Sequence, residues 1–229
     1  MAARIAAPER FPDVDARTLR EWAPLFWRQP SPRIIAVALA AAIAARAAVG
    51  GHRAANLVVI VALIALQPFT EWLLHVFLLH FRPRQVGGRT VDPFVARKHR
   101  AHHRDPQHIG LVFVALPALV GLIVVFALLT GLVLRNLELW LTAQVTGMVL
   151  LLLYEWTHYL IHTAYAPRTR LYRYVWRAHR LHHFKNEHYW FGITNHLADH
   201  VLRTFPDKNA VPTSPTARNL HGELTLGAG

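Results

Sequence analysis

Long apolar segments are the feature that most limits how this chain can fold. Leu111–Leu134 runs for 24 residues without a charge, and roughly 20 apolar helical residues are enough to cross the hydrocarbon core of a membrane. Leu57–Phe81 and Leu139–Tyr165 are also long enough, whereas the Ala-rich run Ile34–Val49 is shorter and is interrupted by Arg46. Because only helices and closed barrels satisfy their backbone groups in lipid, these four blocks predict an all-α integral membrane protein.

Turn residues divide the four predicted transmembrane helices into two hairpins. Gly50-Gly51 separates the first two blocks, and Arg135-Asn136 separates the last two. The tail is rich in small, polar and proline residues, which predicts a loosely ordered segment. We therefore expect three parts: an N-terminal interfacial segment, a membrane domain with a helical histidine-rich cap, and a flexible tail, at residues 1–33, 34–206 and 207–229.

The distribution of positive charge predicts the orientation in the membrane. The formal net charge is +12, yet six of the 25 lysines and arginines precede the first block, seven lie in the middle loop, and nine follow the fourth block. The connections on the other side hold only Arg46, Arg53 and Arg135. Because cytoplasmic loops carry the excess of Lys and Arg, both termini, the middle loop and the cap are predicted to be cytoplasmic. Nucleic-acid binding is disfavoured because no recognition motif accompanies the charge.

Two nearly identical hexapeptides hold six of the 16 histidines: KHRAHH at 98–103 and AHRLHH at 178–183. Histidines three and four residues apart share one face of a helix. Each hexapeptide follows an apolar block that ends in a Glu-Trp pair and two more histidines, in EWLLHVFLLH and EWTHYLIH. The two halves of the chain thus form a pseudo-repeat, which brings four histidine groups to one membrane face.

Ten histidines are predicted to bind metal beneath that face. Ten imidazoles exceed the needs of one ion and suit two ions with about five ligands each; neutral imidazole favours Zn, Cu, Fe and Ni over Mg or Ca. His75 and His80 would point about 140° apart on a regular helix, so the helix must end or be distorted there. The ten candidate ligands are His75, His80, His99, His102, His103, His158, His162, His179, His182 and His183.

Two carboxylates and four further residues complete the candidate site. Glu71 and Glu155 lie at membrane depth, where a lone carboxylate is costly. Each is expected to accept a hydrogen bond from the free N–H of a metal-bound histidine; direct ligation, as in the Glu-x-x-His motif of soluble di-iron bundles, is the alternative. Extra ligands or substrate contacts are expected among His188, His196, Asp199 and His200.

These motifs resemble the fatty acid hydroxylase and sterol desaturase superfamily of integral membrane di-iron oxygenases. The matching stretches are HVFLLH, HRAHH, HYLIH and HRLHH followed by FKNEHYWFGITNHLAD, from about Glu71 to Asp199. The sequence departs from the family where Ala198 precedes Asp199, a position that often holds Trp. The resemblance implies a four-helix membrane anchor, a cytosolic cap, two iron ions on the ten histidines, and an O2-dependent reaction on a lipid.

The function implied by the resemblance is hydroxylation of a fatty acyl chain or related lipid. No haem-binding segment is recognisable, so electrons are expected from a separate ferredoxin, cytochrome or flavoprotein reductase. A sterol or carotenoid hydroxylase and a lipid desaturase stay open as alternatives, because the shape of the pocket decides between them. A metal transporter or sensor is disfavoured, since the histidines crowd one side of the membrane. Zinc would also bind such a site in a purified sample.

Overall fold

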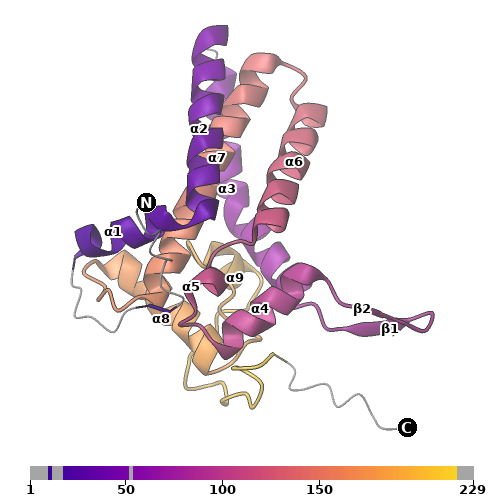
Figure 1. Cartoon of the computed structure of the whole chain (residues 1–229), viewed down its shortest axis with the longest axis vertical. Helices are drawn as coiled ribbons and strands as arrows, with labels where there is room; N and C mark the ends of the chain where they lie inside the picture. The colour runs from indigo at the N-terminus through magenta and orange to yellow at the C-terminus, as the bar shows by residue number, and fades with distance from the viewer. Residues whose placement is uncertain (1–9, 12–17, 52–53, 221–229) are drawn as a thin grey trace, which may run out of the picture.

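The computed structural model describes residues 10–11, 18–51 and 54–220, and its elements are mostly helical (Figure 1). Four stretches are long and apolar enough to cross a membrane: Pro30–Val49, Ala54–Leu79, Ile109–Val133 and Leu137–His162. The predicted all-α fold with four transmembrane helices is confirmed. The first reaches 20 residues because its helix begins at Pro30, and proline is favoured in the first turn of a helix.

One helix is the centre of the membrane bundle. The bundle comprises α2 (Pro30–Val49), α3 (Ala54–Leu73) with its π-helical end η1 (Leu74–Leu79), the short α5 (Ile109–Val112), α6 (Leu116–Val133) and α7 (Leu137–His162). Helices α2, α3 and α6 all pack on α7, and the Ala-rich α2 does so most extensively, since small residues let helices approach closely in a membrane. The chain order is that of two hairpins, but the main packing runs between them.

Large apolar side chains cover the outer faces of these helices. Val37 of α2, Leu57 of α3 and Val133 of α6 are among the most exposed. A soluble protein rarely exposes so extensive an apolar surface, so these faces suit contact with lipid tails. The four apolar helices indicate a multi-pass membrane protein, and the side on which each end lies stays a prediction.

Helix α1 (Leu19–Arg28) lies across the foot of the bundle (Figure 1). Its Trp22 and Phe26 pack with Tyr159 of α7, and the Tyr159 hydroxyl donates to the Trp22 carbonyl (2.9 Å). The described part of the predicted interfacial segment is thus a helix packed against the foot of a transmembrane helix. Residues 1–9 and 12–17 of that segment lie outside the described residues.

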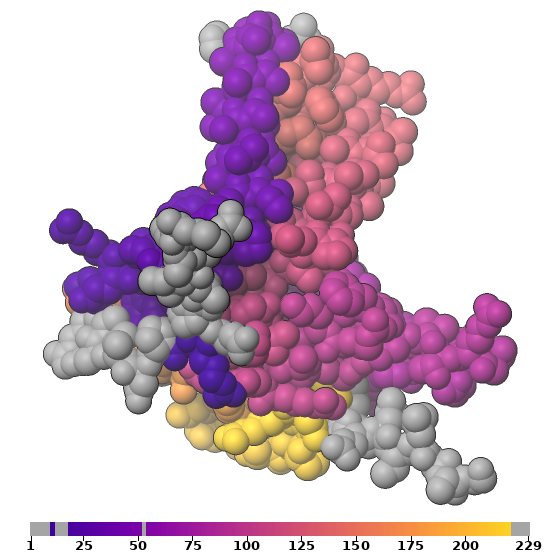
Figure 2. Space-filling model, in the orientation of Figure 1, coloured from indigo at the N-terminus to yellow at the C-terminus, as the bar shows by residue number. Residues whose placement is uncertain are grey.

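A cap at one end of the bundle carries the remaining elements. It contains α4 (Phe94–Arg104), α8 (Arg170–Phe184) and α9 (Leu197–Val201) with their connecting segments. A two-stranded antiparallel hairpin, β1 (Arg84–Val86) and β2 (Arg89–Val91), projects from the side of the cap. Figure 2 shows the bundle as a column on this broader cap.

The described part of the predicted tail, residues 207–220, packs on the cap. Val211, Ala217 and Leu220 are buried, and the Ser214 amide donates to the Lys185 carbonyl (2.7 Å). These contacts are not those of a loosely ordered segment, because these three apolar residues among the polar ones are used for packing. The domain boundaries themselves stay predictions, and residues 221–229 lie outside the described part.

Candidate metal centre

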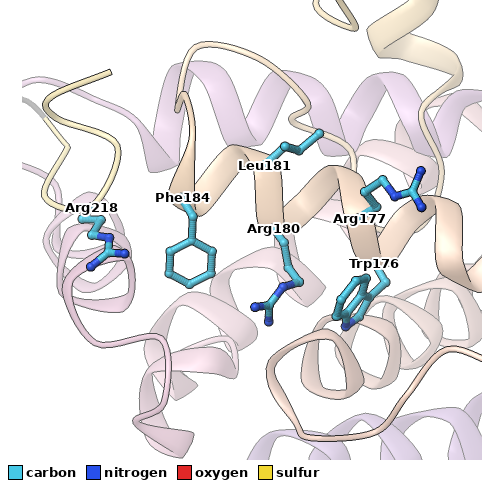
Figure 3. Close-up of a pocket in the computed structure, with 6 residues that line it drawn as sticks. All are labelled: Trp176, Arg177, Arg180, Leu181, Phe184 and Arg218. Atoms are coloured by element: carbon cyan, nitrogen blue, oxygen red, sulfur yellow. The ribbon is translucent and has the colours of Figure 1, made fainter. Parts of the chain in front are cut away.

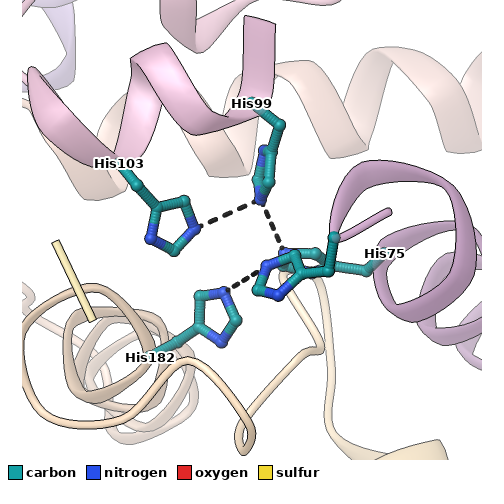
Figure 4. Close-up of side chains that lie close together, drawn as sticks. His75, His99, His103 and His182 are labelled. Carbon is teal, nitrogen blue, oxygen red and sulfur yellow. Dashed lines mark hydrogen bonds between the residues drawn. The ribbon is translucent and has the colours of Figure 1, made fainter. Parts of the chain in front are cut away.

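Four histidine-bearing segments meet where the bundle joins the cap. Two are the ends of transmembrane helices, in η1 and the last turns of α7, and two are the cap helices α4 and α8. In Figure 4, His99 and His103 of α4 point toward His75 of η1 and His182 of α8. The two membrane hairpins thus contribute to a single centre.

The π-helix η1 explains how histidines five residues apart share a site. The amide of His80 donates to the carbonyl of His75 (3.0 Å), which is the i to i+5 pattern of a π-helix. The two ring centroids are 4.8 Å apart. The predicted distortion at the end of this helix is confirmed.

The ten histidines form two groups of five, and within each group the candidate ligand nitrogens all lie within 4.8 Å of one another. Each half of the chain supplies four members to one group and one member to the other. His102 and His182, which occupy equivalent positions in the two hexapeptides, are the exchanged members. The first group is His75, His80, His99, His103 and His182, and the second is His102, His158, His162, His179 and His183.

The histidine rings are largely shielded from water, which disfavours their charged form. Nine of the ten are buried and His80 is partly buried. Outside the membrane-spanning segments, burial lowers the pKa of the cap histidines well below the usual range, and neighbouring histidines lower it further. This holds for His99, His102, His179, His182 and His183. Neutral imidazole is the form that binds transition metals.

Backbone carbonyls determine which ring nitrogen faces the centre. Four Nδ1 atoms lie 2.6 to 3.0 Å from carbonyl oxygens: His75 from Phe191, His103 from Ala217, His158 from Val112 and His182 from Tyr189. A carbonyl only accepts, so Nδ1 carries the proton and Nε2 of the neutral ring presents a lone pair. These carbonyls were not predicted, and no sequence signal identifies a backbone carbonyl.

The Nε2 atoms of several histidines face one another, and they carry too few protons to form a hydrogen bond at every contact. Nε2 of His99 lies 3.1 Å from Nε2 of His75 and 3.2 Å from that of His103, and a single proton on His99 can serve only one of these contacts. In the second group, the Nε2 atoms of His158 and His162 are 3.2 Å apart. Converging lone pairs in a buried site repel unless a cation lies between them. The donor set therefore fits a metal ion in each group.

Glu71 supports the first group without contacting a histidine. Its carboxylate accepts hydrogen bonds from the amides of Ile193 and Thr194 (2.9 Å for Thr194) and from the Thr194 hydroxyl (2.7 Å). It thereby holds the loop whose Phe191 carbonyl accepts from His75. The predicted bond from a ring N–H to Glu71 is absent in the described structure, because the backbone carbonyl takes that place.

Glu155 has the equivalent role in the second group. It accepts from the Val114 amide (3.1 Å) and from the hydroxyl of Ser31 in α2. It thereby holds the connection between α5 and α6, which directly follows Val112, and the Val112 carbonyl accepts from His158. The predicted bond between Glu155 and a histidine is likewise absent among the described residues. Both carboxylates instead bind backbone amides, and a backbone carbonyl nearby in the same segment accepts the hydrogen bond from the histidine.

The loop behind His75 needs both a glycine and a buried acid. A Cβ on Gly192 would lie 2.1 Å from the carbonyl oxygen of Asn195, so no side chain fits there. Asp199 accepts from the amides of Phe191 (3.0 Å) and Gly192 (2.7 Å). Burial would raise the pKa of Asp199, but hydrogen bonds from His196, Thr204 and the Gly192 amide outweigh it and lower that pKa.

The four further candidates lie outside both histidine groups in the described structure. His196 is buried, with Nδ1 2.8 Å from the Asp199 carboxylate. His188 and His200 are exposed, and the hydroxyl of Tyr174 lies 2.5 Å from Nε2 of His200. Of these residues, Asp199 and His196 are the ones that support the loop carrying the Phe191 carbonyl.

An apolar cavity of about 330 Å³ leads from the first histidine group into the bundle. His75 and Tyr154 line it near the cap, and Leu63, Phe126 and Gly147 line it furthest from the cap. At 1.5 Å per helical residue, the stretch from Leu63 to His75 gives a length of about 18 Å. Helices α3 and α6, which both line the cavity, make almost no contact with each other in the described residues.

Comparisons with known proteins agree with this geometry. The model of the fatty acid hydroxylase family matches residues 60–204, more than half of the chain. A dihydroceramide fatty acyl 2-hydroxylase of Arabidopsis thaliana is 30% identical over 156 residues, which are 66% of this chain and 62% of that protein. A fatty acid 2-hydroxylase of Homo sapiens is 32% identical over 146 residues, 62% of this chain and 38% of that protein.

A solved structure has a similar fold. It is full-length scs7p with only the hydroxylase domain visible, and it aligns with a TM-score of 0.62 at 19% identity, covering 85% of this chain and 67% of that chain. At that identity the likeness shows the fold alone. The chain spans less than two thirds of the length of the two relatives described above.

Proposed function

The chain belongs to the fatty acid hydroxylase family, and from this premise we propose that it is a membrane-bound, O2-dependent lipid hydroxylase whose ten box histidines hold two iron ions. The reaction would convert a C–H bond of a fatty acyl chain into C–OH. One atom of O2 enters the product and the other leaves as water, with two electrons and two protons taken up.

The observation that carries the proposal is the convergence of Nε2 lone pairs in two adjacent groups. The ligand set of each group is made of imidazoles alone, which suits iron, zinc or copper better than magnesium or calcium. Zinc has no redox chemistry, and oxidation of an unactivated C–H bond needs a cofactor because side chains cannot supply it. Two bound irons would provide that O2 chemistry.

The protein itself would hold the metal ions, orient their histidine ligands and shield the centre from water. Ring N–H groups that donate to Phe191 and Val112 fix the orientation of His75 and His158. Glu71 keeps the first of these carbonyls in place through its loop. The buried surroundings exclude water, which limits leakage of a reactive oxidant.

The cavity supports a fatty acyl substrate. Its volume falls at the lower end of the roughly 300–1,000 Å³ typical of ligand sites. Its length of about 18 Å slightly exceeds half of the roughly 30 Å hydrocarbon thickness, so it matches one lipid tail. A tail could enter from the bilayer between α3 and α6. The carbon beside the histidines would then lie near the headgroup end, which agrees with the 2-hydroxylase names of the relatives.

The orientation and the electron source are part of the same proposal. The excess of Lys and Arg on the side of the cap supports a cytoplasmic metal centre and cytoplasmic termini. The reductant would be a separate ferredoxin, cytochrome or flavoprotein reductase. A soluble donor could reach the cap from the cytoplasm.

The test is product analysis with purified, iron-loaded protein in lipid nanodiscs supplied with O2, a chemical reductant and ceramides or fatty acids. A product heavier by one oxygen atom is expected, and His162→Ala should abolish it. A product lighter by two hydrogens would instead identify a desaturase. Absence of any oxidised lipid from the iron-loaded protein would refute the proposal.

A further inference from the structure

A group of arginines and aromatic rings surrounds a hollow on the cap surface (Figure 3). The hollow has a volume of about 400 Å³. The residues come from one side of α8 and from the C-terminal segment. We call this the arginine–aromatic surface, and its members are Trp176, Arg177, Arg180, Leu181, Phe184 and Arg218.

The side chains stack on one another, which leaves their charges available. The Arg180 guanidinium carbon lies 4.8 Å from the ring centre of Trp176 and 5.4 Å from that of Phe184, and Arg218 lies 5.5 Å from Phe184. Arg177, Arg180 and Arg218 are exposed. None of the three forms an ion pair with an acid among the described residues. Three positive charges therefore face solvent around an accessible aromatic ring.

This surface lies directly outside the candidate metal centre. Phe184 follows His183 in the chain, and the two ring centroids are 6.0 Å apart. Arg218 follows Ala217, whose carbonyl accepts from Nδ1 of His103 (3.0 Å). His183 belongs to one histidine group and His103 to the other, so the surface is one residue away from both groups. It is the outer wall of the centre.

We propose that the arginine–aromatic surface is the docking site for an acidic one-electron carrier protein; this inference rests on the proposed function. Each turnover requires two electrons, so the carrier would lose one electron in each of two encounters, and the two protons come from water. Phe184 and His183 would provide the short route between carrier and centre.

The chemistry of the surface favours a protein partner over a lipid surface. The C-terminal segment that carries Arg218 lies on the side of the cap away from the transmembrane helices (Figure 1). Arginine and aromatic residues are enriched at protein interfaces and dominate their binding energy. Redox encounters use small interfaces, and opposite charges steer such partners together. A hollow of this size with three exposed arginines suits a small acidic carrier.

The first experiment measures binding without depending on the metal. The whole chain of 229 residues in zwitterionic nanodiscs is titrated with an acidic [2Fe–2S] ferredoxin as the probe. The test variant combines Arg177→Glu, Arg180→Glu and Arg218→Glu. The control variant combines Arg82→Glu, Arg84→Glu and Arg89→Glu in and beside the β-hairpin, which changes the net charge equally at exposed positions.

We expect the wild type to bind the ferredoxin and to lose affinity as salt rises from about 10 mM to about 100 mM, where the Debye length falls from about 30 Å to about 10 Å. The test variant should bind at least about tenfold more weakly at low salt, and the control within about twofold of wild type. Equal binding by wild type and test variant, or equal losses in both variants, would overturn the proposed site. So would a test variant that loses binding to anionic vesicles but keeps ferredoxin binding, which would identify a lipid-binding surface.

A second experiment separates this inference from the proposed function. Iron-loaded wild type and test variant are compared with reduced ferredoxin and with a small chemical reductant. We expect the test variant to form hydroxylated lipid normally with the chemical reductant and about tenfold more slowly with ferredoxin. If neither protein forms product with the chemical reductant, the hydroxylase function fails while the binding result stands. If ferredoxin drives both proteins equally, the docking site is refuted.

Discussion

If the proposed function holds, a single methyl group added at Gly147 should shift the proposed hydroxylase toward shorter acyl chains. Gly147 of α7 lies at the end of the apolar cavity furthest from the histidines, opposite Phe126 of α6. A Cβ at this position would be 2.4 Å from Cε1 and 2.6 Å from Cζ of the Phe126 ring. Ordinary contact begins near 3.4 Å, so the ring must retreat from α7 by about 1 Å, and the space at the end of the cavity is lost.

The size of the effect follows from the space removed. A retreat of about 1 Å excludes about one methylene group, and burying one methylene is worth about 0.8 kcal/mol. Since RT is about 0.59 kcal/mol, the preference for a chain one carbon shorter should rise about fourfold in kcat/KM. Phe126→Leu should act in the opposite direction, because it opens the same end of the cavity.

The assay is a competition between ceramides or fatty acids of graded chain length, with products measured by mass spectrometry. Ratios of products within one reaction do not depend on the amount of active enzyme. Gly121→Ala on α6 is the matched control, because a Cβ there would meet no atom within 4 Å. Identical length profiles for wild type, Gly147→Ala and Phe126→Leu would refute the assignment of the cavity to the acyl chain.

Three further predictions concern the metal centre and the opposite end of the bundle. His102→Ala should lower bound iron from two ions to about one per chain, measured by elemental analysis; two retained ions would contradict its place in the second group. Glu71→Ala should weaken metal binding about 10- to 100-fold in a chelator competition, and Glu71→Gln should weaken it less, because glutamine keeps one acceptor oxygen. Equal metal affinity in the two variants would contradict the inference that Glu71 holds the loop carrying the Phe191 carbonyl. Glu138→Ala leaves the Arg46 guanidinium, 3.2 Å from that carboxylate and largely buried, without its carboxylate partner, although its hydrogen bonds to Thr142 and to the carbonyls of Gly50 and Gly51 stay. It should lower the free energy of unfolding in detergent by about 3–5 kcal/mol, whereas Arg46→Met with Glu138→Leu should recover much of that loss.

The positions of the transmembrane helices and of the box histidines could be predicted because their signals are local. An uncharged run such as Leu111–Leu134 predicts a membrane-spanning helix from its own length and composition. Histidines three and four residues apart predict a shared helix face. The spacing of His75 and His80 even predicts that the helix must be distorted, although a π-helix and a helix end would satisfy it equally. Such inferences need no knowledge of how distant segments pack.

The supporting contacts could not be predicted because they depend on how distant segments cross. Glu71 was expected to accept from a histidine, but the amides of Ile193 and Thr194 reach it first. Residues 207–220 read as a loose tail from composition, yet Ala217 supplies the carbonyl for His103. A backbone carbonyl or amide is the same in every residue, so composition and spacing carry no information about which one is used.

The exchange of His102 and His182 has a consequence for folding. If each half of the chain supplied all five ligands of its own ion, the halves could bind metal independently. Because each group takes one member from the other half, neither site is complete until the histidine rings of α4 and α8 have come into contact. Metal binding would then stabilise the assembled cap rather than either half, since a ligand that binds only the native arrangement shifts the equilibrium toward it. Loss of one exchanged histidine should therefore weaken the joint between the halves as well as one metal site.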